Sequence, residues 1–319
     1  MVTIFTDPRM LDHVPPARHP ERPERLQAVL KHLARVGILN TSPKGFVRPA
    51  TDAELGEVHT PGHLARIAAA QASGGGQVED DTWMSSGSEL AARLAAGAVV
   101  EAVDLVVEAP PGSVAACLVR PPGHHALANA PMGFCLYNSI AVGAAHAVKA
   151  KGIDRVLIVD FDVHHGNGTQ AIFDADPAVG FLSIHRYPFY PGTGAADETG
   201  TGRGLGTKKN VPLAYGTSRR GFLDAFRMGL EALAARIKPQ LVLISAGFDA
   251  HAEDPVGDLG LDIEDFEGIT QAVVDVAQVH AEGRIVSVME GGYNVPILAG
   301  CVALHLETLG ASTHSPGSR

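Results

Sequence analysis

Five short, largely apolar segments recur along the sequence, and stretches with helical periodicity lie between them. The segments are VAACLV, RVLIV, VGFLSI, LVLIS and RIVSVM, at residues 114–119, 155–159, 179–184, 241–245 and 284–289. Segments that are apolar on both faces are typical of parallel strands buried between two layers of helices. Helices are predicted at residues 23–33, 88–107, 138–150, 219–237 and 265–280. The sequence therefore predicts a single α/β domain built on a central, mostly parallel sheet.

Composition narrows the class of protein. Of the 319 residues, 45% are apolar and 19% are charged, which is enough for a large core, and the net charge of −10 argues against a nucleic-acid-binding surface. The three cysteines fit no disulfide or zinc pattern, and neither a signal peptide nor a membrane-spanning run is evident. We expect a cytoplasmic protein with a folded domain at residues 1–310 and a polar, disordered tail at residues 311–319.

Polar residues capable of chemistry follow each of the five apolar segments. In chain order they stand in RPPGHH, DFDVHHGNGT, HRYPFYPGTG, AGFDAH and EGGYN. The carboxyl ends of parallel strands lie at one edge of a sheet, where ligands bind in open α/β folds. We therefore predict one shared site at this edge.

Asp160, Asp162 and His164 alternate with two apolar residues, so a continuing strand would direct the three polar side chains to one side. Carboxylate oxygen and imidazole nitrogen both suit Zn²⁺, and two Asp with one His leave a coordination position open for water. Asp249, which follows another apolar segment, is the obvious third ligand after Asp162 and His164. The alternative is an ordinary polar loop with capping carboxylates and a solvated histidine.

Further candidates for chemistry lie in the neighbouring loops. His124 and His125 form an adjacent pair suited to proton transfer, although two surface histidines would look the same. Tyr293 follows two glycines and could donate a hydrogen bond to an oxyanion, or be a structural tyrosine. Phe134 and Tyr190 could wall an apolar slot, or simply pack in the core.

The motifs RPPGHHA, GFC, VDFDVHHGNGTQ, SIHRYPFYPGTG, SAGFDAHAEDPVG and MEGGYN occur in this order. Together they resemble the zinc-dependent histone deacetylase family, in particular its class II-like bacterial members and the acetylpolyamine amidohydrolases. The segments HPERPERL and VHTPGHL also fit, and the resemblance covers residues 1–308. It implies a three-layer, arginase-like fold whose sheet has about eight strands.

The resemblance also implies roles for individual residues. One Zn²⁺ is expected on three ligands, Asp162, His164 and Asp249. The catalytic residues are expected to be His124, His125, Asp160 and Tyr293, with Asp160 paired to His124. The substrate tunnel is expected to be lined by Gly133, Phe134, Tyr190 and Val256. Arg25 corresponds to an arginine near an acetate-exit channel, and a K⁺ or Na⁺ ion is expected near Asp160, Asp162, His164 and Ser183.

Three positions bear on the specificity and the proton transfer. Asn167 stands where class I members have an aspartate behind the second histidine, which fits the class II-like pattern and supports His125 as the main proton shuttle. Tyr190 replaces the usual phenylalanine. Val256 stands where polyamine-selective relatives carry an acidic residue at the rim, although Glu79, Asp80 and Asp81 could supply negative charge at the mouth.

The expected activity is hydrolysis of the amide bond in an acylated amine such as acetyl-lysine, through attack of a water molecule that zinc activates. An acetylpolyamine or another small N-acyl amine is an alternative substrate. Two further alternatives are a binuclear manganese ureohydrolase and a catalytically silent acyl-amine binding module. His59 and His165 are expected to be structural.

Overall fold

The structure, a computed structural model, describes residues 1–311, and its centre is a seven-stranded parallel sheet. In spatial order the strands are β1 (Val2–Phe5), β4 (Val114–Cys117), β9 (Ile285–Met289), β8 (Leu241–Ala246), β5 (Val156–Asp160), β6 (Val179–Arg186) and β7 (Lys208–Leu213). The sheet thus has seven strands where about eight were expected. The remaining strands, β2 (Gly76–Glu79) and β3 (Thr82–Met84), form a separate antiparallel hairpin.

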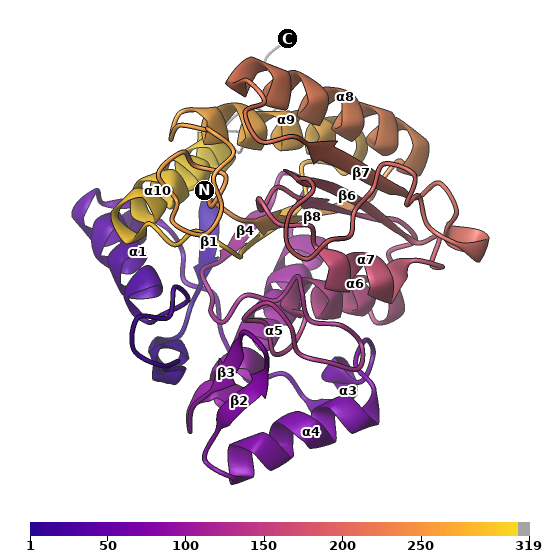
Figure 1. Cartoon of the computed structure of the whole chain (residues 1–319). Helices are drawn as coiled ribbons and strands as arrows, with labels where there is room; N and C mark the ends of the chain where they lie inside the picture. The colour runs from indigo at the N-terminus through magenta and orange to yellow at the C-terminus, as the bar shows by residue number, and fades with distance from the viewer. Residues whose placement is uncertain (312–319) are drawn as a thin grey trace.

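Helices cover both faces of the sheet, so the domain has the three layers that the sequence predicted (Figure 1). Helices α8, α9 and α10 lie over one face, and α5 and α6 pack against the other. The α-helices are α1 (Glu24–Arg35), α2 (Ile38–Thr41), α3 (Asp52–Leu55), α4 (Pro61–Ala72), α5 (Ser88–Glu108), α6 (Ser139–Lys149), α7 (Asn167–Phe173), α8 (Arg219–Ile237), α9 (Asp265–His280) and α10 (Val295–Ala311). Two 3-10 helices are η1 (Pro8–Asp12) and η2 (Gly202–Gly204).

All five apolar segments form strands of the central sheet, and the five predicted helices form α1, α5, α6, α8 and α9. Strands β1 and β7, which lie at the two edges of the sheet, were not predicted. The sequence of β7, KKNVPL, is too polar to resemble a buried strand. The expected tail falls on Ala311, which ends α10, and on residues 312–319, which lie outside the described part of the chain.

The parallel arrangement brings the carboxyl ends of β4, β9, β8 and β5 side by side, because these four strands are consecutive neighbours. Every residue of β4, β5, β8 and β9 is buried. The loops that leave these strands carry the predicted metal ligands, the histidine pair and Tyr293, so the buried sheet is a rigid base for them. Within the described residues, no helix combines the length and the apolar character needed to cross a membrane.

His305 in α10 is buried in the core, and its protonation should make the stability of the fold depend on pH. Its Nδ1 lies 2.7 Å from the Thr270 hydroxyl and its Nε2 lies 2.8 Å from the Ser287 hydroxyl. Burial lowers the pKa of His305 from 6.5 to about 3. The unfolded chain therefore binds more protons below pH 6.5, and the stability contributed by neutral His305 is full above that pH and lost as the pH falls toward 3.

We expect the free energy of unfolding to fall by about 2 kcal/mol more in the wild type than in H305Q when the pH is lowered from 7 to 5. Urea unfolding of both proteins at the two pH values measures this difference. Equal losses in the two proteins would show that His305 can bind a proton inside the folded core.

Candidate metal centre

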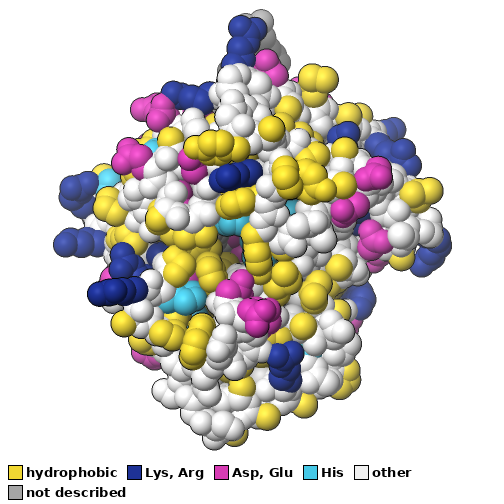
Figure 2. Space-filling view, in the orientation of Figure 1, with side chains coloured by type: hydrophobic (Ala, Val, Ile, Leu, Met, Phe, Trp, Pro, Cys, Tyr) yellow, Lys and Arg dark blue, Asp and Glu magenta, His cyan; other side chains and the backbone are white. Residues whose placement is uncertain are grey.

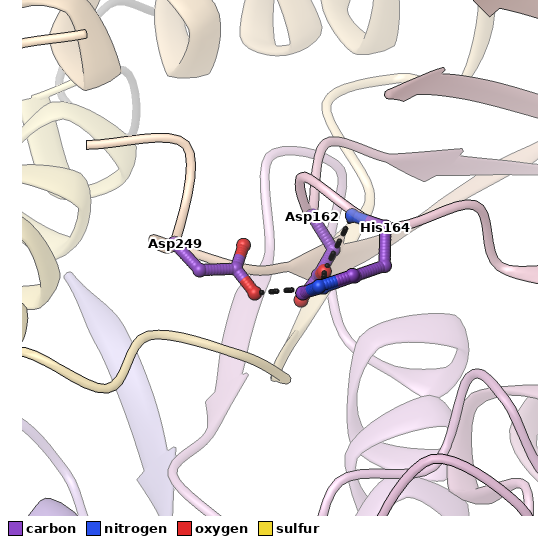
Figure 3. A group of neighbouring side chains, drawn as sticks. All are labelled: Asp162, His164 and Asp249. Atoms are coloured by element: carbon purple, nitrogen blue, oxygen red, sulfur yellow. Dashed lines mark hydrogen bonds and ion pairs between the residues drawn. The ribbon is translucent and has the colours of Figure 1, made fainter. Parts of the chain in front are cut away.

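Three ligand-type side chains meet beyond the ends of β5 and β8. Asp162 and His164 lie in the loop after β5, and Asp249 lies in the loop after β8 (Figure 3). His164 Nδ1 is 3.0 Å from Asp162 Oδ1 and 3.2 Å from Asp249 Oδ2. All three residues are buried, and one donor atom of each lies within 4.8 Å of the others. The three predicted ligands therefore lie together and could hold a metal ion.

Backbone groups orient the two carboxylates. Asp162 Oδ2 accepts a hydrogen bond of 2.8 Å from the Gly291 N–H, and Asp249 Oδ1 accepts one of 2.9 Å from the Val163 N–H. A Cβ atom at position 291 would overlap Oδ2 of both Asp162 and Asp249, so only glycine allows the backbone to approach so closely. The remaining carboxylate oxygen of Asp249, Oδ2, is buried and accepts no hydrogen bond from residues 1–311, and its near neighbour is His164 Nδ1 at 3.2 Å.

The charges of this group fit a bound cation. Burial, followed by the negative charge of Asp162, raises the pKa of Asp249 to about 7, although His164 acts in the opposite direction. Two buried carboxylates in contact are costly unless a positive charge compensates them. A cation would also bind Oδ2 of Asp249, which accepts no hydrogen bond from the described residues. The donor set of two carboxylates and one imidazole suits zinc and related divalent transition metals.

Two histidines from the loop after β4 lie beside these three possible metal ligands. His124 Nδ1 is 3.0 Å from Asp160 Oδ2, and His125 Nδ1 is 2.7 Å from the side-chain oxygen of Asn167. The centroids of the two imidazole rings are 4.0 Å apart. An amide oxygen only accepts hydrogen bonds, so Nδ1 of His125 carries a proton and Nε2 is left able to accept one. This arrangement leaves His125 able to act as a base.

The surroundings of the two histidines differ strongly. Burial opposes protonation of His124, but the charges of Asp160 and Asp162 outweigh it and raise the pKa of His124 to about 10. Burial, and then the nearby His124, hold the pKa of His125 well below its usual value.

Glu290, which no motif argument had singled out, accepts hydrogen bonds from the N–H groups of Gly123 and His124 at 2.7 and 3.2 Å. Glu290 thereby fixes the backbone that carries His124 and His125.

A cavity of about 210 Å³ leads to this group, and its lining is mostly aromatic and apolar. The lining residues are Asp81, His125, Gly133, Phe134, His164, Phe189, Tyr190, Val256 and Tyr293. Figure 2 shows histidine among hydrophobic side chains at the centre of this face, with acidic side chains nearby. All four predicted lining residues, Gly133, Phe134, Tyr190 and Val256, are present in this set.

Aromatic rings define the walls of the cavity. The Tyr190 ring stands perpendicular to that of His125 at 5.3 Å, and the Phe189 ring stacks on that of His164 at 5.3 Å with an interplanar angle of 16°. Phe189 was not predicted, although it immediately precedes Tyr190 in the same motif. The Tyr293 ring contacts Phe134 edge-on at 5.7 Å. The site thus brings a group of possible metal ligands, an imidazole and a phenol to one largely aromatic and apolar cavity.

A family model described as the histone deacetylase domain matches residues 19–309. The chain belongs to the histone deacetylase family. In a solved structure, the HDA15 HD domain, the fold matches with a TM-score of 0.91 at 38% sequence identity, covering 98% of this chain and 90% of that one.

Named relatives of the family include enzymes from all three domains of life. The chain is 39% identical over 303 residues to the human polyamine deacetylase HDAC10, covering 91% of this chain but 44% of that protein. It is 38% identical to a histone deacetylase-like amidohydrolase of Pseudomonas aeruginosa, over 92% of this chain and 78% of the relative. It is also 37% identical to a probable deacetylase of Archaeoglobus fulgidus, over 92% and 82% respectively. The chain is therefore a hydrolase of the deacetylase class.

The remaining residues that the family resemblance singled out lie around this site. Arg25 is buried, donates from Nε to the Gly292 carbonyl at 2.6 Å, and lies 4.8 Å from the centroid of the Tyr293 ring. The acetate-exit channel that was expected near Arg25 stays a prediction. Ser183 is the register partner of Asp160 in the sheet, and its hydroxyl contacts the His185 ring at 2.9 Å.

The two histidines that were expected to be structural make extensive hydrogen bonds. His165 Nδ1 lies 2.8 Å from the Thr193 hydroxyl, and its Nε2 lies 2.9 Å from the side-chain oxygen of Gln170. These bonds join α7 to the loop that carries Tyr190. His59 Nε2 accepts a hydrogen bond of 2.9 Å from the Asn138 N–H, at the start of α6.

Proposed function

We propose that the protein is a zinc-dependent deacylase that hydrolyses the amide bond of an acylated linear amine, with acetyl-lysine as the leading substrate class. The observation that carries this proposal is that His164, which converges with Asp162 and Asp249, lines the cavity together with His125 and Tyr293. A linear acyl amine would place its carbonyl beside His164 and its apolar stem between the aromatic walls.

Zn²⁺ held by Asp162, His164 and Asp249 would polarise the acyl carbonyl and lower the pKa of a water molecule. His125 Nε2 takes the proton of the attacking water, because its Nδ1 proton is directed to Asn167. The Tyr293 hydroxyl donates a hydrogen bond to the oxyanion that develops on the carbonyl oxygen. His125 then delivers the proton to the departing amine, so that the products are a carboxylate and a free amine.

The choice of amine depends on the mouth of the cavity. Val256 gives one side of the lining an apolar character, whereas Asp81 provides a carboxylate whose Oδ1 accepts a hydrogen bond of 3.0 Å from the Gly133 N–H. HDAC10 is named as a polyamine deacetylase, and the Pseudomonas relative as a histone deacetylase-like amidohydrolase. Acetyl-lysine is our first choice because no acidic residue stands at position 256, and an acetylpolyamine is the second.

A panel of substrates with defined metal loading tests this proposal. Protein stripped of metal and reloaded with one equivalent of Zn²⁺ is given acetyl-lysine peptides and acetylspermidine in parallel, and acetate release is measured. We expect turnover of the peptides that disappears on chelation and returns with Zn²⁺. Faster turnover of acetylspermidine would favour the second substrate class, and no acetate from either would contradict the proposed function.

The number of metal ions separates this proposal from a binuclear manganese ureohydrolase. Asp249 is followed by Ala250 and His251, and His251 Nδ1 accepts a hydrogen bond from the Glu253 N–H at 3.0 Å. Within residues 1–311, Asp162, His164 and Asp249 are the one group found to converge as possible metal ligands. This favours a single ion for each chain.

A further inference from the structure

The carboxylate of Asp254 joins two loops that are distant in the sequence. Its Oδ1 accepts hydrogen bonds from the N–H groups of Val256 and Gly257 at 2.9 and 3.1 Å. Its Oδ2 accepts hydrogen bonds from the N–H groups of Tyr293 and Asn294 at 2.6 and 3.1 Å. The first two bonds belong to a local turn, but the other two hold the backbone that bears the phenol.

The segment before Tyr293 needs such an anchor, because its glycines have no side chains that could fix it. Gly291 must lack a Cβ atom where it approaches the two ligand carboxylates, and Gly292 has a φ of 118°, which side chains rarely allow. Arg25 holds the Gly292 carbonyl. Asp254 holds the next N–H groups from the opposite direction, so the backbone is fixed on both sides.

The position of the Tyr293 hydroxyl depends on this backbone. The ring is supported by packing against Phe134 and the Arg25 guanidinium, at 5.7 and 4.8 Å respectively. Packing of this kind resists large movements, but a hydrogen-bond donor to an oxyanion must be placed more accurately than a ring contact requires. A small rotation of the backbone at Tyr293 would carry the hydroxyl away from the carbonyl oxygen.

We propose that Asp254 is a positioning residue for the reaction, which fixes the Tyr293 hydroxyl relative to the Val256 side of the cavity. This inference rests on the proposed function. Val256 and Tyr293 line the same cavity, and Asp254, which is 8% exposed, accepts a hydrogen bond from the backbone of each. One carboxylate thus sets the distance between the lining at Val256 and the oxyanion donor.

The substitution D254N tests this role with little change in size. Asparagine keeps one acceptor oxygen and presents an NH₂ group in place of the other, so one of the two pairs of N–H groups loses its acceptor. We expect kcat to fall about 100-fold while KM changes much less, because the misplaced group acts in the transition state. D258N is the matched control in the same loop. Among residues 1–311, the hydrogen bonds of the Asp258 side chain go to the Gly260 N–H and the Tyr215 hydroxyl, and not to the backbone of Tyr293.

A double-mutant cycle with Y293F separates positioning from general support of the fold. If Asp254 acts through the Tyr293 hydroxyl, D254N should cost no more than about twofold in kcat once that hydroxyl is absent. If Asp254 only stabilises the loops, the loss should be the same in both backgrounds. Equal losses would overturn the proposal. Should D254N fail to fold, as judged by near-UV circular dichroism, D254E replaces it, because glutamate keeps the charge and displaces both oxygens.

A second readout does not depend on turnover. Protein labelled with 3-fluorotyrosine should give a ¹⁹F signal for each of its 5 tyrosines, and the signal of Tyr293 is identified by its loss in Y293F. We expect D254N to shift or broaden that signal, and D258N to alter the Tyr215 signal instead. An unchanged Tyr293 signal in D254N would overturn the proposal even if the wild type proved to be inactive, so the failure of the proposed function and that of this inference can be distinguished.

Discussion

Replacing Asp249 with asparagine is expected to remove the bound zinc and to reduce kcat/KM by more than about 100-fold. Changing a residue that only supports a metal ligand costs up to about 100-fold, and the loss of a ligand itself should cost more. The amide is neutral and a poorer ligand than the carboxylate that it replaces. The fold should survive, because the asparagine oxygen can still accept the hydrogen bond from the Val163 N–H. Zinc content after dialysis and acetate release from an acetyl-lysine peptide measure the two effects.

D258N is again the matched control, since it makes the same chemical change in the same loop, at a side chain that accepts hydrogen bonds from the Gly260 N–H and the Tyr215 hydroxyl. It should retain both zinc and activity. Full zinc content in D249N would contradict the assignment of Asp249 as a ligand. Lost zinc together with undiminished hydrolysis would show that the reaction does not use this metal centre.

The convergence of Asp162, His164 and Asp249 could be predicted from the sequence because two local patterns were sufficient. Alternation after an apolar strand placed Asp162 and His164 on one side, and the end of another apolar strand offered Asp249. What the pattern could not provide was the adjacency of β8 and β5, which the sheet order establishes. Convergence of the five strand ends was predictable because all five strands are parallel, and this direction followed from their apolar character on both faces.

The supporting residues left no comparable signal. Glu290 and Asp254 act on backbone N–H groups of distant loops, and such bonds require no particular side chain on the partner.

Lys208, in the unpredicted strand β7, is charged but buried, with its ammonium donating to the Val179 carbonyl at 2.7 Å. A lysine in a sequence pattern indicates an exposed position, so the local sequence did not predict a buried strand here. Tertiary contacts, which the local sequence does not reveal, stabilise β7 instead.

Replacing Tyr293 with phenylalanine is expected to lower kcat by a factor of about 10² to 10³ while KM stays nearly constant, because only the oxyanion of the transition state would lose its donor. The ring contacts with Phe134 and Arg25 should persist, since phenylalanine keeps the aromatic ring. Zinc content should also stay at the wild-type level, because Tyr293 is not one of the three ligands. Steady-state kinetics on an acetyl-lysine peptide, with the metal content measured in the same samples, test this expectation.

Y137F is the matched control for the loss of one phenol hydroxyl. Tyr137 is buried, its hydroxyl makes no hydrogen bond with any residue that the structure describes, and it is not among the residues that line the cavity. Its removal should leave kcat unchanged, because a buried hydroxyl without a partner contributes nothing to the reaction and costs free energy in the fold. If Y293F keeps the kcat of Y137F, the oxyanion is stabilised without the phenol, and the metal centre with His125 must account for the whole of the catalysis.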